Sequence, residues 1–200
     1  FWGSGEFTLP FGNFDVNITV PADHILEATG DLLNRNEVFT AEQLKRYQLA
    51  EKTFDKPVIV VTQAEAEAAE KGFSDKKKTW KFKATNVRDF GISTSRKFIY
   101  DAMAVKLETR NAMAISLYPK EGNPLWEEYS TRMVAHTLKS YSAHTFDYPY
   151  PKAISINAED QGMEYPMICW NYGRPDKNGV TSERTKNGMM SVIVHEVGHN

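Results

Sequence analysis

The sequence contains a single cysteine, Cys169, among its 200 residues. One cysteine cannot form an internal disulfide framework or a multi-cysteine metal site, so the sequence excludes both. Cys169 lies in the apolar run of residues 166–170. This context favours a buried structural thiol.

The sequence also lacks an excess of charge of either sign. It has 24 lysine and arginine residues and 26 aspartate and glutamate residues, which gives a formal net charge of -2. A chain this close to neutral gives no reason to expect nucleic acid or an anionic membrane as a partner. No stretch is long and apolar enough to span a bilayer. With 41% hydrophobic and 25% charged residues, the composition is that of an ordinary globular protein. No signal peptide is present at Phe1, which leaves the compartment open.

The motif that organises the sequence is His-Glu-x-x-His, which runs from His195 to His199. The apolar residues 188–194 before it predict a buried helix. Positions four apart lie on one face of a helix, so both imidazoles point the same way, as two ligands of one metal ion require. Zinc takes neutral histidine nitrogens readily. Glu196 lies beside them, where a carboxylate can act as general base for a metal-bound water.

This five-residue pattern leaves an alternative open, which is an ordinary amphipathic helix with two hydrogen-bonded histidines. A catalytic zinc also needs a third protein ligand and an open position for water. The sequence ends one residue after His199, so the third ligand is expected either upstream or in a larger protein of which these residues are a piece.

The first part of the sequence predicts strands with small helical insertions. Residues 14–20 alternate between apolar and polar, which is typical of a strand with one wet face, and residues 25–29 are the expected hairpin partner. Capping boxes at Thr40 and Thr62 predict the starts of two helices. This part also predicts strands at residues 58–61 and 79–85 and a solvated lysine turn at residues 76–78.

The second part predicts longer elements, and we place a domain boundary at residue 86, which gives domains of residues 1–86 and 87–200. Strands are predicted at residues 98–107, 112–118, 153–157 and 166–171. A long helix between the second and third strands is predicted to have an apolar face of Leu125, Tyr129, Met133, Leu138 and Tyr141. Residues 158–165 receive no element, and residues 172–184 are expected to be an exposed loop. This order predicts an α+β fold, whose edge strand beside the motif helix can pair with an extended peptide.

A second motif, Gln-Gly-Met-Glu-Tyr at residues 161–165, precedes the first by about thirty residues. It resembles the G-x-M-E-N motif of the aminopeptidase N-type gluzincin zinc metallopeptidases, which precedes H-E-x-x-H at comparable spacing in that family. The resemblance covers the whole chain. Residues 1–86 resemble the end of the family's β-rich N-terminal domain, and residues 87–200 the first half of its thermolysin-like catalytic domain. Several segments resemble one bacterial branch, namely residues 80–90, 148–152 and 162–170.

The resemblance implies specific roles for the motif residues. His195 and His199 match zinc ligands, and Glu196 matches the general base. Glu164 matches the glutamate that binds the free α-amine of a peptide, with Gly162 and Met163 as its neighbours in the substrate-binding segment.

The rest of the family's site is a third zinc ligand, a glutamate on the next helix, and a tyrosine that steadies the tetrahedral intermediate. Both positions lie beyond Asn200. The resemblance therefore implies about half of a Zn²⁺ site, and an isolated chain without peptidase activity.

Two residues depart from the family motif. Gln161 stands where the motif has glycine, which allows close approach of a peptide backbone, and Tyr165 stands where it has asparagine, which helps to shape the amine pocket. Both departures bear on aminopeptidase specificity rather than on peptidase chemistry. For Glu164 the alternative interpretation is a solvated loop carboxylate.

Three hypotheses follow. The leading one is a zinc aminopeptidase that removes N-terminal residues from peptides with a free N-terminus. The second is a gluzincin endopeptidase or dipeptidase in which Glu164 does not bind the amine. The third is a non-catalytic metallopeptidase-like scaffold, against which the intact Glu196 argues. Export, for example to the periplasm, is favoured by the bacterial branch alone, and the oligomeric state and side-chain preference stay open.

Overall fold

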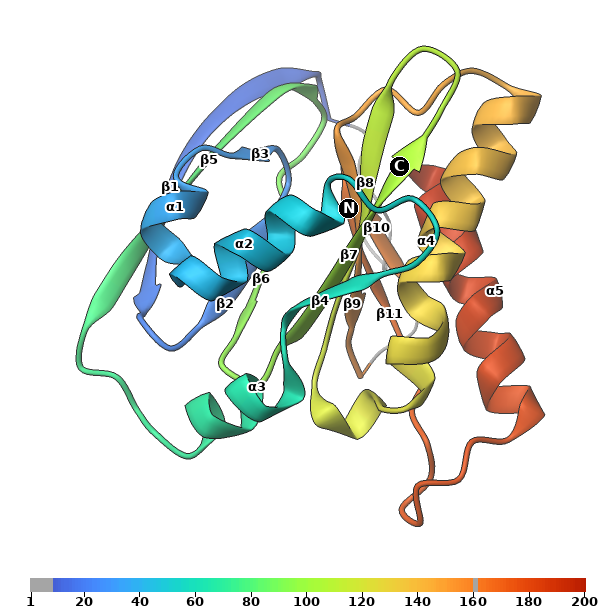
Figure 1. Ribbon diagram of the computed structural model, residues 1–200. Helices are drawn as coiled ribbons and strands as arrows, with labels where there is room; N and C mark the ends of the chain where they lie inside the picture. The colour runs from blue at the N-terminus through green and yellow to red at the C-terminus, as the bar shows by residue number, and fades with distance from the viewer. Residues whose placement is uncertain (1–8, 160–161) are drawn as a thin grey trace, which may run out of the picture.

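The computed structural model describes residues 9–159 and 162–200, so Gln161 of the second motif lies outside the described residues. The described chain forms a three-stranded, a two-stranded and a six-stranded sheet with helices packed around them (Figure 1). This combination confirms the predicted α+β fold class.

In chain order the elements are β1 (Gly12–Pro21), β2 (Ile25–Ala28), β3 (Asp31–Leu32), α1 (Arg35–Val38), α2 (Ala41–Ala50), β4 (Val58–Val61), α3 (Gln63–Glu70), β5 (Lys77–Val87), β6 (Ile92–Ser95), β7 (Ile99–Lys106), β8 (Asn111–Tyr118), the 3-10 helix η1 (Lys120–Gly122), α4 (Leu125–His144), β9 (Lys152–Asn157), β10 (Met163–Tyr165), β11 (Ile168–Asn171) and α5 (Glu183–His199).

The two small sheets are built from strands that are distant in sequence. β1 and β3 both pair with β5, and β2 pairs with β6, so the predicted hairpin between β1 and residues 25–29 is wrong. The reason lies in burial. β1 exposes every second residue along most of its length, whereas β2 is buried at all four positions and lies in the interior.

The lysine run is only partly a solvated turn. Lys77 and Lys78 belong to β5, and Lys78 Nζ donates a hydrogen bond of 2.8 Å to the carbonyl oxygen of Val38. The aliphatic stem of a lysine can lie along apolar surface while its ammonium finds a polar partner. The solvated-turn prediction is therefore wrong for Lys78.

Both predicted capping boxes are present. The Thr40 side chain accepts from the Gln43 amide at the start of α2, and the Thr62 side chain accepts from the Glu65 amide at the start of α3. In each case the side chain of the third helical residue accepts a hydrogen bond from the backbone amide of the capping threonine. A second backbone donor at the start of the helix thereby gains a partner.

The six-stranded sheet has the order β10-β11-β9-β8-β7-β4. β9 is parallel to both of its neighbours, and the other pairs are antiparallel. The sequence predicts no element at residues 158–165, which is wrong for β10, because three residues are too few to show an alternating pattern. β4 precedes residue 86 and pairs with β7, which follows it, while the division into two domains remains a prediction.

Each face of this sheet is covered. α4 and α5 lie side by side on one face, and the small sheets with α2 cover the other (Figure 1). The thiol of Cys169 is fully buried on the helix side and donates to the carbonyl oxygen of Ile154, as expected for a structural cysteine. The helices of the described residues are all too short or too polar to traverse a lipid bilayer.

The long helix is confirmed as α4, but its predicted apolar face is partly wrong. Tyr141 is 45% exposed, whereas Ser130 and Thr131 are buried. The Ser130 hydroxyl hydrogen-bonds to Ser116 of β8 at 2.8 Å, so a polar side chain lies against the sheet with its hydrogen-bonding capacity used. A count of apolar residues cannot find such positions.

One buried ion pair joins the two-stranded sheet to the large sheet. Lys152 Nζ of β9 lies 2.6 Å from Glu27 Oε2 of β2, and the Tyr100 hydroxyl donates to Glu27 Oε1 at 2.8 Å. Both charged side chains are buried, with 5% and 0% exposure. A buried carboxylate that loses its cation is left uncompensated, which is much more costly than the loss of a surface pair.

We therefore expect Lys152→Met to lower the free energy of unfolding by about 3–5 kcal/mol. The double variant Glu27→Gln, Lys152→Met should recover most of this loss, because no isolated charge remains. The matched control is Lys186→Met, which breaks the exposed pair of Lys186 with Glu183 and should cost no more than about 1 kcal/mol. Urea denaturation measures all three, and equal losses for the two single variants would contradict the assignment.

Candidate metal centre

The helix that carries the first motif is fixed to the sheet along one face. Its N-terminus is capped by Ser182, whose hydroxyl accepts from the Thr185 amide at 3.0 Å. Met189, Ile193 and Val197 follow at intervals of four and are buried against the sheet and α4. The helix therefore presents its other face outward in a defined orientation.

His195 and His199 lie on that outward face, and both are exposed. Their Nε2 atoms are 3.0 Å apart, with ring centroids separated by 4.6 Å. Two nitrogens bound at about 2.0–2.1 Å to one tetrahedral zinc would be separated by about 3.3 Å. The two imidazoles thus share one face and converge as the spacing predicts, and the donor pair fits a zinc ion. Their role as ligands stays a prediction.

Glu196 differs from its histidine neighbours because it is buried, with 5% exposure. The pKa of its carboxyl group is raised, first because burial disfavours the charged form, and then because the Glu164 carboxyl hydrogen-bonds to it and adds a like charge. His195 and His199 act in the opposite direction. The Glu196 carboxyl group thus lies buried beside the two histidines, and its role as general base stays a prediction.

Gly162 lies directly against this carboxyl group. A Cβ atom at position 162 would lie 2.0 Å from Glu196 Oε1 and 2.7 Å from Glu196 Cδ. The φ angle of Gly162 is 25°, in the region that favours glycine. Only a residue without a side chain leaves the Glu196 carboxylate in its present position.

β10 presents the other motif residues on two faces. Glu164 lies opposite Cys169 in the β10–β11 pair, on the side of α5, where its carboxyl group reaches Glu196. Met163 and Tyr165 lie on the opposite face, because successive side chains of a strand alternate. Gly162, Glu164 and Glu196 therefore come together beside the two histidines, whereas Met163 does not join them. The substrate-binding roles of Gly162, Met163 and Glu164 are untested and remain predictions.

The sequence reasoning missed the residues that support the motif turn. The Tyr148 hydroxyl donates to Asn200 Oδ1 at 3.2 Å, and Asn200 Nδ2 donates to the carbonyl oxygen of Glu196 at 3.2 Å. A Cβ at Gly198 would lie 2.7 Å from the Tyr141 ring. The one signal of this packing in the sequence is Gly198, a small residue at an x position of the H-E-x-x-H motif. The neighbouring helix α4 packs closely against it.

A third metal ligand is not found among the described residues, which contain no group of three or more histidine, cysteine, aspartate or glutamate side chains arranged to hold a metal ion. The two histidines alone are an incomplete site, since zinc in proteins takes at least three protein ligands.

Comparison with solved structures finds the fold of this chain in zinc metallopeptidases. A mutant of a two-domain M1 zinc metallopeptidase bound to L-arginine matches with a TM-score of 0.57 at 15% identity, over 96% of this chain and 34% of that chain. The M1 zinc metallopeptidase from Deinococcus radiodurans matches with a TM-score of 0.56 at the same identity and coverage. A mutant of the Deinococcus radiodurans enzyme bound to a Tyr-Ser-Ala substrate gives 0.53 at 14% identity.

These likenesses show a metallopeptidase-like fold, and the chain spans about a third of the length of the structures it matches. No protein-family model matches the sequence. No curated protein matches it either.

The geometry predicts how this chain binds zinc. Calorimetric titration of zinc into the 200-residue chain should give a binding free energy much weaker than that of complete structural zinc sites, which is about 10–16 kcal/mol. The reason is that two imidazoles without a third protein ligand hold zinc poorly. His199→Ala should remove the residual binding, and His136→Ala, an exposed histidine of α4, should leave it unchanged. Tight one-to-one binding that is lost in His199→Ala would show that the chain itself supplies a third ligand.

Proposed function

We propose that this chain carries the first half of the active site of a zinc aminopeptidase, with His195 and His199 as two ligands of the zinc ion. The observation that carries the proposal is the convergence of the two Nε2 atoms at 3.0 Å beside the buried carboxyl group of Glu196. A fold shared with M1 zinc metallopeptidases supports it. The third ligand has to come from outside the described residues.

The proposed chemistry follows from the position of the Glu196 carboxyl group beside the two histidines. Zinc, when bound, lowers the pKa of a water molecule and polarises the peptide carbonyl. Glu196 takes a proton from the attacking water and passes it to the leaving amine, as a general base and then a general acid.

Glu164 gives the proposal its exopeptidase character. Its carboxyl group lies beside that of Glu196, and its like charge contributes to the raised pKa of the Glu196 carboxyl group. An ammonium group placed at Glu164 would offset this repulsion and would form a charge-assisted hydrogen bond. The free N-terminus of a peptide supplies that ammonium. One Deinococcus radiodurans neighbour is described with a Tyr-Ser-Ala substrate, which supports a peptide as the ligand. A periplasmic or exported location is a further proposal, which only the resemblance supports.

The role of Glu196 is tested in the zinc-loaded protein that contains this sequence. Glu196→Gln should keep zinc bound but lower kcat by about 10²–10⁴-fold, because the base is removed while the ligands remain. Glu183→Gln is the matched control, since Glu183 lies on the same helix in its exposed first turn. Near-normal kcat in the Glu196 variant, with zinc content measured by atomic absorption, would disprove the role.

The role of Glu164 is tested by substrates that differ only at the N-terminus. Glu164→Ala should raise KM for peptides with a free amine and affect N-acetylated peptides far less. A hydrogen bond to a charged group contributes about 1.5–3 kcal/mol, which corresponds to roughly a 10–150-fold loss. Equal losses on both substrates would show that Glu164 is structural and would favour an endopeptidase.

A further inference from the structure

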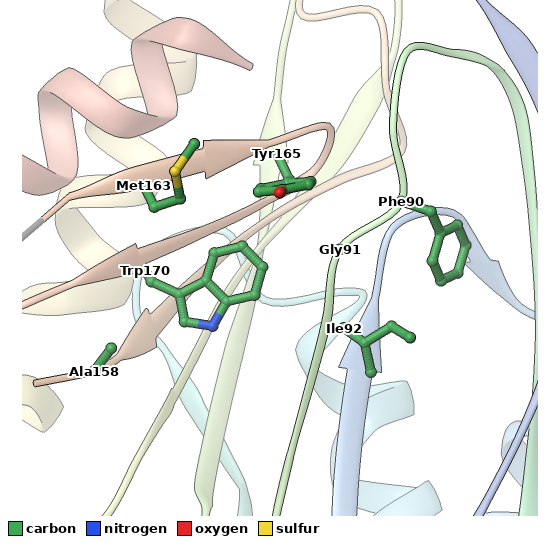
Figure 2. Close-up of a pocket in the computed structure, with 7 residues that line it drawn as sticks. All are labelled: Phe90, Gly91, Ile92, Ala158, Met163, Tyr165 and Trp170. Atoms are coloured by element: carbon green, nitrogen blue, oxygen red, sulfur yellow. The ribbon is translucent and has the colours of Figure 1, made fainter. Parts of the chain in front are cut away.

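A cavity of about 470 Å³ lies on the face of the β10–β11 hairpin that points away from Glu164. Met163, Tyr165 and Trp170 of the hairpin form one side of it, and residues 90–92 form another (Figure 2). Ligand pockets in proteins commonly have volumes of about 300–1,000 Å³. The cavity is therefore large enough for an aromatic side chain.

The walls of the cavity are held in place by close packing. The rings of Tyr165 and Trp170 meet edge to face, with centroids 5.5 Å apart. The backbone of Gly91 lies against them, since a Cβ at that position would be 2.8 Å from the Trp170 ring. The cavity is thus preformed, and a ligand would not have to order these side chains first.

The lining residues carry no charge, and most of them are apolar or aromatic. An ionised ligand group would find no charged partner among these residues, whereas an apolar group would gain contact area. The chemistry of the cavity therefore selects a bulky apolar or aromatic group.

The cavity and the candidate metal centre are connected through a single strand. β10 is the edge strand of the sheet and pairs only with β11 among the described residues. An extended peptide can add to such an edge by backbone hydrogen bonds, and its side chains then alternate between the two faces of the sheet. A peptide residue opposite Glu164 faces the metal centre, and the next residue faces the cavity.

We infer that this cavity binds the side chain of the second residue of a peptide whose backbone pairs with β10, and that it selects bulky apolar or aromatic residues there. The inference rests on the proposed function, because the proposed contact of Glu164 with the N-terminal amine places the first residue. With the first residue on the Glu164 face, strand alternation directs the second side chain into the cavity.

Peptide binding to the 200-residue chain tests the inference without turnover. Calorimetry compares three tripeptide amides with a free amine: Ala-Phe-Ala, Ala-Ala-Ala and Phe-Ala-Ala. Ala-Phe-Ala should bind about tenfold or more tightly than the other two, because burial of the phenyl ring adds apolar contact only from the second position. Equal binding of the three peptides, or no binding of Ala-Phe-Ala at millimolar concentration, would overturn the inference.

Ile92→Asp is the decisive variant, since Ile92 lines the cavity and is 44% exposed, so the fold can accept the charge. It should abolish the preference for phenylalanine. Leu49→Asp is the matched control, because Leu49 is an exposed leucine of α2 that does not line the cavity, and this variant should retain the preference. Ala158→Leu, which fills the cavity from another side, should also weaken the preference, and circular dichroism verifies that each variant is folded. A preference that survives both cavity variants would overturn the assignment.

Failure of the inference and failure of the proposed function give different results. If the zinc-loaded protein hydrolyses peptides through Glu196 but ignores the second residue, the cavity assignment is wrong and the function stands. If the preference for phenylalanine depends on Ile92 while Glu196→Gln has no effect on turnover, the cavity assignment stands and the catalytic proposal is wrong.

Discussion

The burial of the six-stranded sheet on both faces is the constraint on which the rest of the structure depends. Ile99 and Tyr100 are adjacent in β7 and both fully buried, because Ile99 faces the core under α4 and α5 while Tyr100 faces the core under the small sheets. A strand buried on both faces has no side chain free for chemistry. Functional side chains of the sheet can therefore come only from its edges. α2 packs against β4 at one edge, which leaves β10, whose three residues are half-buried, as the strand available to a ligand.

Burial of the sheet also encloses the ion pair of Glu27 with Lys152, and hydrogen bonding explains why this pair is tolerated in the interior. Both oxygens of the carboxylate have partners, Tyr100 on one and Lys152 on the other, so the charge is fully hydrogen-bonded. The three residues come from β2, β7 and β9. A buried pair of this kind is weak evidence for net stability, since hydrophobic replacements are often as stable. The pair does, however, connect β2 of the two-stranded sheet with β7 and β9 of the large sheet.

Local sequence signals predicted local structure well and pairing poorly. The capping boxes at Thr40 and Thr62 depend on residues three positions apart, so the sequence contains the whole interaction. The pairing of β2 with β6 joins Leu26 to Thr94, and nothing near either residue indicates the other. At the candidate site the convergence of His195 and His199 followed from helix periodicity. The contact of Gly162 with Glu196 did not, because it depends on where β10 crosses α5.

The departure at Tyr165 gains a physical meaning from strand alternation. Judged by the motif alone, a tyrosine in place of asparagine next to Glu164 would alter the amine pocket. In the folded chain the Tyr165 ring lies on the other face of β10, packed edge to face against Trp170. The substitution therefore leaves the contact between Glu164 and Glu196 intact and adds aromatic surface to the opposite side. One short strand thus separates two sets of side chains by its faces. One face holds the Glu164 carboxyl group beside Glu196 of α5, and the other presents the aromatic ring of Tyr165, so that either face can vary without the other.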